Sequence, residues 1–289
     1  MTKKNKEKGK TSIAGTIAMV VATATAPVIA EADIGEAIRM PPGYASVQTI
    51  GAQYTADRLV TEDGVEVPID LEKKIGKATI MYKSGKFFGA VTVPYSNAEN
   101  TTLDAKAEGL GDVSIEAGPH FNKKYTNGSL HVMPTVTVKF PTGDHDDKQP
   151  LNPGTGKAEI EAWLRATGLY KDATFDLGAG YTHIPEGETD KIGFRVTPAV
   201  KLGKYARVGF EAVGSYALDG SVENVKAGPV LRLMTKDAEK GPHVTFSYQQ
   251  DMHSHGCPEG TLTTVRVRVP VKTSDLKMPK LHQYQRRAR

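Results

Sequence analysis

The sequence has little of what most structural sites require. It contains a single cysteine, Cys257, which excludes a disulfide framework and a structural zinc site built from several thiolates. Beyond the first thirty residues, no apolar run approaches the length of about eighteen residues that a membrane helix needs. Net charge is also missing there: the first thirty residues hold five of the 37 basic and one of the 33 acidic residues, which leaves 32 of each sign. A neutral chain of this kind gives no indication of nucleic-acid binding.

Residues 1–30 are typical of a secretory signal peptide. Five lysines come first, an apolar stretch follows from Ile13 to Ala22, and the small residues Val28 and Ala30 fit the positions before a cleavage site. A membrane anchor is the alternative, but the segment is short and is diluted by threonine and alanine. We therefore expect the signal peptide to be removed and the chain to be exported.

The chain from residue 45 to residue 271 consists of runs in which apolar and polar residues alternate. Successive side chains of a strand point to opposite faces, so each run has one apolar and one polar face. In the first run the apolar face holds Ile50, Ala52, Tyr54 and Ala56. Residues 31–44 lead into this region and end in a Pro-Pro-Gly breaker. Twelve runs of about ten residues can be traced: 45–57, 74–83, 86–95, 113–121, 130–140, 158–170, 175–182, 192–201, 206–216, 225–233, 244–249 and 265–271.

This alternation fits either a soluble sheet with one wet face or a membrane barrel with lipid outside and water inside. Run length favours the barrel, since a spanning strand needs roughly 9–11 residues and soluble strands commonly have about five or six. The connections alternate in length, with long ones at 58–73, 96–109 and 141–157 and tight ones at 84–85, 171–172 and 203–204. Aromatic residues stand at run ends on the outward face, as interfacial girdles require: Tyr82, Tyr95, Phe121, Phe140, Tyr170, Phe175 and Tyr181. The sequence therefore predicts an all-β fold, an antiparallel up-and-down transmembrane β-barrel of about 12 strands, in contact with outer-membrane lipid and lipopolysaccharide.

In such a barrel the polar face of each run lines the interior. Twelve strands exceed the roughly eight whose interior side chains fill and fall short of the roughly sixteen to eighteen of open porins, so we expect a narrow, partly occluded channel. The charges on this face form a structural network or guide a solute, and the pattern leaves both interpretations open. The candidate lumen-lining residues are Glu116, His120, His131, Lys139, Glu159, Glu161, Arg165, Arg195, Arg207, Glu211, Arg232, Arg266 and Arg268.

Several short segments resemble the outer-membrane proteins of the MetA-pathway of phenol degradation family. They are Pro42-Gly43, the strand-opening stretch 109–112 (GLGD), the strand end 139–144 (KFPTGD) and the glycine-rich strand 177–181 (LGAGY). The likeness covers about residues 40–271. It implies an outer-membrane location and passage of small hydrophobic or aromatic compounds, and it brings no catalytic residues and no cofactor.

The C-terminal end departs from that resemblance. Barrels of this kind normally close with an aromatic residue that the insertion machinery reads, whereas the last run here ends Val269-Pro270-Val271. Residues 272–289 follow as a basic tail, which we expect to be a disordered periplasmic extension because it is rich in charge of one sign.

Three other segments contain residue types that could bind a metal or take part in catalysis. His253, His255 and Cys257 fall in one expected external loop and could offer ligands to a metal, but a fourth ligand is not evident. Residues 144–147 form an acidic loop without the glycine and distal glutamate of a calcium loop. His183 has outward parity, as a lipid hydrolase would need, but no serine partner and no Gly-x-Ser-x-Gly motif accompany it. We therefore predict no metal site and no enzyme activity. A structural or adhesive barrel without solute flux remains the main alternative.

Overall fold

The computed structural model describes residues 40, 43–146, 149, 151–185, 189–235 and 241–275, and the expected signal peptide lies outside them. Among the described residues there are fourteen strands and one short 3-10 helix, 273–275. The strands are β1 (Tyr44–Val60), β2 (Glu66–Ser84), β3 (Phe87–Asn100), β4 (Ala105–Leu110), β5 (Ser114–Pro119), β6 (Phe121–Tyr125), β7 (Gly128–Lys139), β8 (Glu159–Tyr170), β9 (Ala173–His183), β10 (Lys191–Leu202), β11 (Ala206–Ala217), β12 (Glu223–Met234), β13 (His243–His255) and β14 (Cys257–Lys272).

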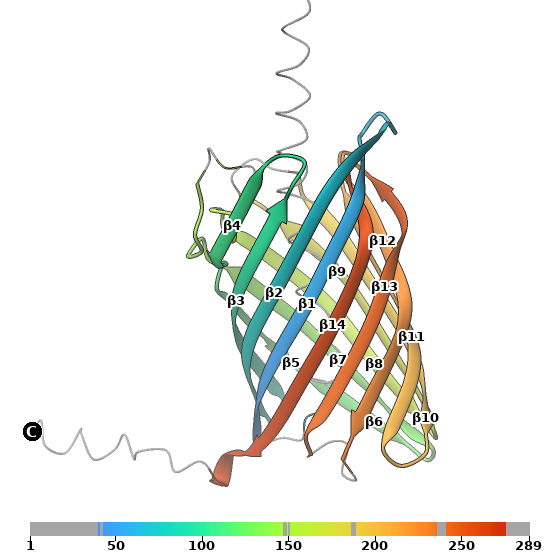
Figure 1. Cartoon of the computed structure of the whole chain (residues 1–289). Coiled ribbons are helices and arrows are strands. Elements are labelled where there is room, and N and C mark those ends of the chain that lie inside the picture. Colours follow the sequence, from blue (N-terminus) through green and yellow to red (C-terminus); the bar gives the residue numbers. More distant parts are fainter. Residues whose placement is uncertain are drawn as a thin grey trace, which may run out of the picture.

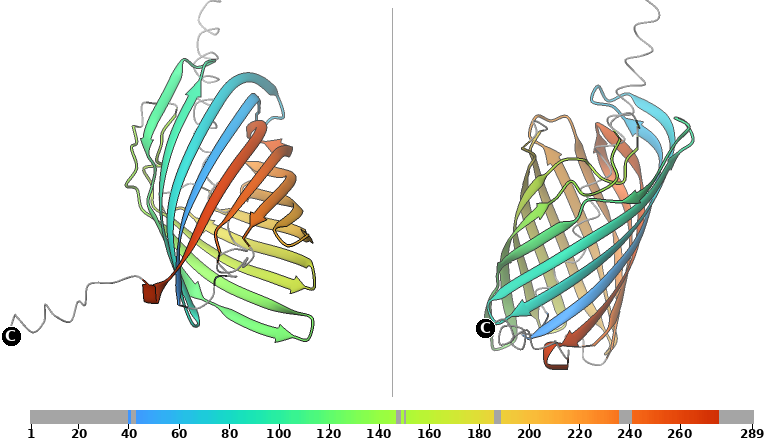
Figure 2. Two further views of the ribbon diagram at one scale, coloured as in Figure 1. Left: turned by 60° about the horizontal axis from the view of Figure 1, so that its bottom comes forward. Right: turned by 90° about the vertical axis from the view of Figure 1, so that its left-hand side faces the viewer.

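These strands form one closed, antiparallel barrel (Figure 1). Apart from the stretch β4–β6, each strand pairs with the next in the chain, and β1 pairs with β14 from Tyr44–Lys272 to Val60–Cys257, which closes the wall. Strands β4, β5 and β6 follow one another along a single position of that wall: β4 and β5 pair with β3, and β5 and β6 pair with β7. The wall therefore has twelve strand positions, as the sequence predicts. Figure 2 shows the same tilted strands from two further sides.

The outer surface carries the apolar faces expected for eleven of the twelve runs. Exposed apolar side chains follow every strand around the wall, with Ile80 63% and Leu164 57% exposed. All seven aromatic residues expected at run ends are exposed as well. No helix among the described residues is long and apolar enough to cross a membrane.

The first run is the exception, and its expected orientation is wrong. Ile50, Ala52, Tyr54 and Ala56 are buried, whereas Val47, on the other face, is 48% exposed. The pairing agrees, because Val47 lies opposite Val269 and Ile80, which are both exposed. Alternation defines two faces but not which of them meets lipid. Here the apolar face packs against apolar side chains of β2 and β14 inside the barrel.

The prediction of a long loop is also wrong at two of the three expected places. Residues 58–73 and 96–109 are mostly strand, because β1 and β2 are joined at 61–65 and β3 and β4 at 101–104. The outer faces of these extensions are polar, with Asp70 and Glu99 exposed and Glu72 half-buried, so their composition resembled that of a loop. Figure 1 shows the β1–β2 hairpin rising above the other hairpins.

The third long loop, 140–158, is present and is held against the wall by Asp112. This carboxylate is buried and accepts hydrogen bonds from Gly143 N at 2.9 Å, Thr155 N at 2.6 Å and Thr155 Oγ1 at 2.7 Å. A side chain could not replace the hydrogen of Gly143, since an added Cβ would lie 2.6 Å from the carbonyl carbon of Gly111. The GLGD and PTGD segments of the sequence thus pack against each other where β4 gives way to β5.

At the opposite end of the barrel the tight turns lie where the sequence places them, at 85–86, 171–172 and 203–205. The tail begins in ordered structure, because Lys272 ends β14 and residues 273–275 form the 3-10 helix. The rest of the tail, from 276 onward, lies outside the described residues.

Candidate functional site: the barrel interior

The interior of the barrel has a polar wall and an apolar wall. The thirteen charged or histidine residues singled out in the sequence are buried or half-buried. Several of their cross-strand neighbours are buried as well, as for Arg165 opposite Met133 and Arg195 opposite Gly178. All thirteen therefore lie on the face of the sheet opposite the exposed apolar side chains.

Ion pairs join several of these residues on the polar wall. Arg165 pairs with Glu116, Arg195 with Glu211, and Lys139 with Glu159. Glu161 joins the last pair, with its Oε1 3.7 Å from Lys139 Nζ, and also accepts a hydrogen bond from Trp163 Nε1 at 3.3 Å. Each pair links strands that are neighbours or one strand apart, so this network stiffens the wall.

The two histidines meet near the end of the barrel that carries the tight turns. The rings of His120 and His131 are stacked with centroids 5.4 Å apart, and His120 Nε2 lies 3.3 Å from His131 Nδ1. Lys83 Nζ is also 3.3 Å from His120 Nε2, and Ser129 Oγ is 2.9 Å from His131 Nε2. The sequence placed the two histidines on the polar face but did not single out Lys83, although Lys83 shares the parity of Lys77 and Thr79 on the polar face of its run.

Four arginines of the set, Arg207, Arg232, Arg266 and Arg268, gather on strands β11, β12 and β14. Arg207 lies directly opposite Arg232, and Arg232 lies opposite Thr245, which in turn faces Arg266. Arg268 lies opposite His243 and Gln48. This quarter of the interior therefore concentrates positive charge.

One buried ion pair in the interior was not singled out by the sequence. Lys226 Nζ lies 2.6 and 2.8 Å from the two carboxylate oxygens of Asp251 and 4.3 Å from the centre of the Tyr54 ring. Asn224 Nδ2 and Gly260 N also donate hydrogen bonds to Asp251, at 2.7 and 2.6 Å. Lys226 has the parity of the polar face of its run, so its inward orientation could have been predicted. Asp251 lies beyond the end of the predicted run 244–249 and carried no such signal.

The apolar wall is formed mainly by β1, β2 and β3. Two clusters of buried apolar side chains lie on it. One, toward the hairpin tips, consists of Ala52, Tyr54, Ala56, Leu59, Ile69, Leu71, Ile75, Ala98, Ala107, Leu151 and Leu262. The other, nearer the opposite end, consists of Met40, Met81, Phe88, Ala90 and Met133. An interior that is polar on every strand was expected, so this wall corrects the sequence-based picture.

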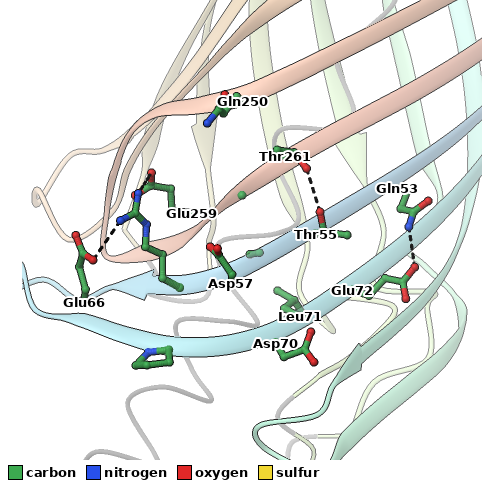
Figure 3. Close-up of a pocket in the computed structure, with 14 residues that line it drawn as sticks. Gln53, Thr55, Asp57, Glu66, Asp70, Leu71, Glu72, Gln250, Glu259 and Thr261 are labelled. Atoms are coloured by element: carbon green, nitrogen blue, oxygen red, sulfur yellow. Dashed lines mark hydrogen bonds and ion pairs between the residues drawn. The ribbon is translucent and has the colours of Figure 1, made fainter.

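A hollow of about 810 Å³ lies on the outer face of the β1–β2 and β13–β14 hairpins, beyond the band of exposed apolar side chains (Figure 3). Arg58 bridges it, with ion pairs to Glu66 at 3.2 Å and Glu259 at 2.6 Å. Gln53 donates a hydrogen bond to Glu72 at 2.8 Å. This hollow was not predicted, because it lies partly on strand extensions that were expected to be loops.

The segments that could bind a metal do not form a cluster of ligands in the described part of the chain. No group of three or more histidine, cysteine or acidic residues that could hold a metal occurs within the described ranges. Residues 253–257 form the tip of the β13–β14 hairpin, where Cys257 is buried and His253 pairs with Glu223 at 3.2 Å. Asp144 accepts a hydrogen bond from Leu110 N at 3.0 Å and so helps to fix loop 140–158.

His183 is oriented by a carboxylate. Its Nδ1 lies 2.8 Å from Asp190 Oδ1, and Tyr181 donates a hydrogen bond to the other carboxylate oxygen. The hydrogen bonds from Tyr181 and His183 lower the pKa of Asp190, which lies in the loop before β10. No serine hydroxyl of the described chain is hydrogen-bonded to His183.

Comparison with known proteins identifies relatives of the fold. No family model matches the chain, and a search of curated proteins finds no match. The COG4313 outer membrane channel from Pseudomonas putida F1 superposes with a TM-score of 0.73 at 13% sequence identity, over 83% of this chain and 100% of that one. The NanC porin is 8% identical with a TM-score of 0.45, over 77% and 97% of the two chains. At 13% identity, the likeness to the COG4313 channel establishes the barrel fold alone. The TM-score with the NanC porin is too low to support an argument.

Proposed function

We propose that this chain is an outer-membrane channel that admits small apolar or aromatic solutes through the interior of its barrel. The observation that carries the proposal is the two-sided interior. Polar and charged side chains on β7–β14 face apolar clusters on β1–β3, and buried apolar side chains inside a barrel are not needed for contact with lipid. An interior of this kind offers an apolar solute a surface that excludes water.

The outer surface supports the proposed location. Exposed apolar side chains surround the wall, and aromatic residues lie toward both ends of the strands, as expected for a hydrocarbon layer between two interfaces. The signal-like residues 1–30 and the likeness in fold to an outer membrane channel from Pseudomonas putida F1 point the same way.

Solute flux into proteoliposomes tests this function. Liposomes that contain the refolded barrel should take up a small aromatic solute faster than empty liposomes. The competing interpretation is a structural barrel, which the buried ion pairs would also suit. Uptake no faster than that of empty liposomes, with a barrel shown to be folded by its heat-dependent gel migration, would favour the structural barrel.

A further inference from the structure

We propose that the interior binds an anionic head group, so that the solute is a small amphipathic monoanion, a carboxylate carried on an apolar body. This inference rests on the proposed function and narrows its class of solute. It begins at β14, whose inward residues include Arg266 and Arg268 and which β13 separates from the arginine-bearing strand β12.

The first observation is the placement of like charges. Arg207 and Arg232 occupy directly opposite positions of neighbouring strands, an arrangement that destabilises a sheet when both side chains are charged. Thr245 separates Arg232 from Arg266 on the next two strands. The register therefore gathers guanidinium groups on one part of the inner face, which includes the strand that carries Arg268.

The second observation is an unsatisfied guanidinium. Arg268 is 2% exposed, and its Nε donates a hydrogen bond to Ser46 Oγ at 3.2 Å. Its Nη2 is buried and has no hydrogen-bond partner among the described residues. Leaving a buried donor of this kind unpaired is costly, and a planar guanidinium is matched in shape and charge to a carboxylate. A ligand could therefore supply the acceptor that Arg268 Nη2 lacks.

Gln48 completes the polar side of this site. It lies directly opposite Arg268 across the β1–β14 ladder and is 1% exposed. Its Oε1 likewise has no hydrogen-bond partner in the described part of the chain, so the two side chains face each other without bonding. The Gln48 amide can donate to one oxygen of a carboxylate whose other oxygen accepts from Arg268.

The apolar side of the site is the next feature along the same wall. Ser46 lies opposite Met81, and Met81 lies opposite Ala90. Met81 and Ala90 belong to the cluster with Phe88 and Met133. A ligand whose carboxylate contacts Arg268 can therefore place an apolar body on this cluster. An inorganic anion would leave the apolar cluster unused, and a neutral apolar solute would leave Arg268 unpaired.

Benzoate and benzamide, which share a ring and differ in charge, test the inference. In proteoliposomes the wild-type barrel should pass benzoate in preference to benzamide. Arg268→Gln should lower benzoate flux roughly tenfold, the loss expected for a charge-assisted hydrogen bond, and leave benzamide flux unchanged. The matched control is Arg58→Gln, which removes a guanidinium from the outer face and should leave both fluxes as in the wild type.

A second variant covers the case in which Arg268→Gln does not fold. Gln48→Glu places a carboxylate of the chain opposite Arg268, where it should satisfy the guanidinium and exclude benzoate to a similar extent. Benzoate flux that is unchanged in folded Arg268→Gln or in Gln48→Glu overturns the inference, as does a wild-type barrel that passes both solutes equally. Those results leave the channel itself intact.

Failure of the channel function gives a different result, which is no flux of either solute. Equilibrium binding of benzoate to the barrel in detergent then decides the inference. Binding that Arg268→Gln or Gln48→Glu weakens roughly tenfold supports an anion site in a barrel that does not conduct. No detectable binding of benzoate overturns the site.

Discussion

Lys226 and Asp251 form a buried ion pair between β12 and β13, with Lys226 Nζ 2.6 and 2.8 Å from the two carboxylate oxygens. The side chain of Asp251 is 0% exposed and that of Lys226 is 6% exposed. Two backbone or amide donors and the Tyr54 ring complete the surroundings of the pair. This pair ties the apolar wall of the interior to the polar wall.

Removing the lysine should destabilise the barrel strongly. Lys226→Met leaves the Asp251 carboxylate buried without its cation, so the free energy of unfolding should fall by about 3–5 kcal/mol. Arg58→Gln breaks an ion pair on the outer face and should cost at most about 1 kcal/mol. Urea unfolding of the refolded barrels measures both changes. Equal midpoints for Lys226→Met and the wild type would show that the pair does not hold the two walls together.

Gly180 makes room for the single tryptophan. An added Cβ at Gly180 would lie 2.3 Å from two ring atoms of Trp163, whereas one at Gly51 would meet nothing within 4 Å. Gly180→Ala should therefore displace the indole and lower the free energy of unfolding by about 1–3 kcal/mol, as overpacking does. Gly51→Ala is the matched control. Tryptophan fluorescence checks the displacement, and an emission spectrum identical to that of the wild type in Gly180→Ala would contradict the packing.

The same contact shows what the sequence could and could not predict. Two-residue alternation placed Leu177 and Tyr181 on the outer face and Gly180 on the inner face. This prediction needs only the sequence of the strand itself, because alternation does not depend on the neighbouring strands. Glycine is needed at position 180 because Trp163 of β8 lies directly opposite it. That neighbour is set by the register between β8 and β9. Register is not visible in a single run, so the packing inside the barrel could not be predicted.

Strand β1 shows a second limit. Its run of Ile50, Ala52, Tyr54 and Ala56 alternates as the others do, but the apolar face points inward, because Tyr54 lies opposite Leu262 and packs with Leu71. The twelve-strand barrel and the outward faces of the other runs followed from periodicity and length. The apolar wall depends on which strands meet across the closure of the barrel.

Loop 140–158 depends on one carboxylate. Asp112→Ala removes the acceptor of three hydrogen bonds, from Gly143 N and from Thr155 N and Oγ1, and should loosen the loop by about 1.5–3 kcal/mol without unfolding the barrel. Hydrogen exchange at Gly143 and Thr155 measures the opening. Asp63→Ala, at the exposed tip of the β1–β2 hairpin, is the control and should leave that exchange unchanged. Equal protection in Asp112→Ala and the wild type would mean that other contacts hold the loop.

Blocking the interior is the most direct test of the central claim that solutes pass through it. Ala90 is buried on the apolar wall, and Ala179 is exposed on the outer face of β9. Uptake of a small aromatic solute into proteoliposomes should fall to the level of empty liposomes for Ala90→Trp and stay at the wild-type level for Ala179→Trp. Both variants should keep the heat-dependent gel migration of the folded barrel. Undiminished uptake by folded Ala90→Trp, or wild-type uptake no faster than that of empty liposomes, would contradict the account.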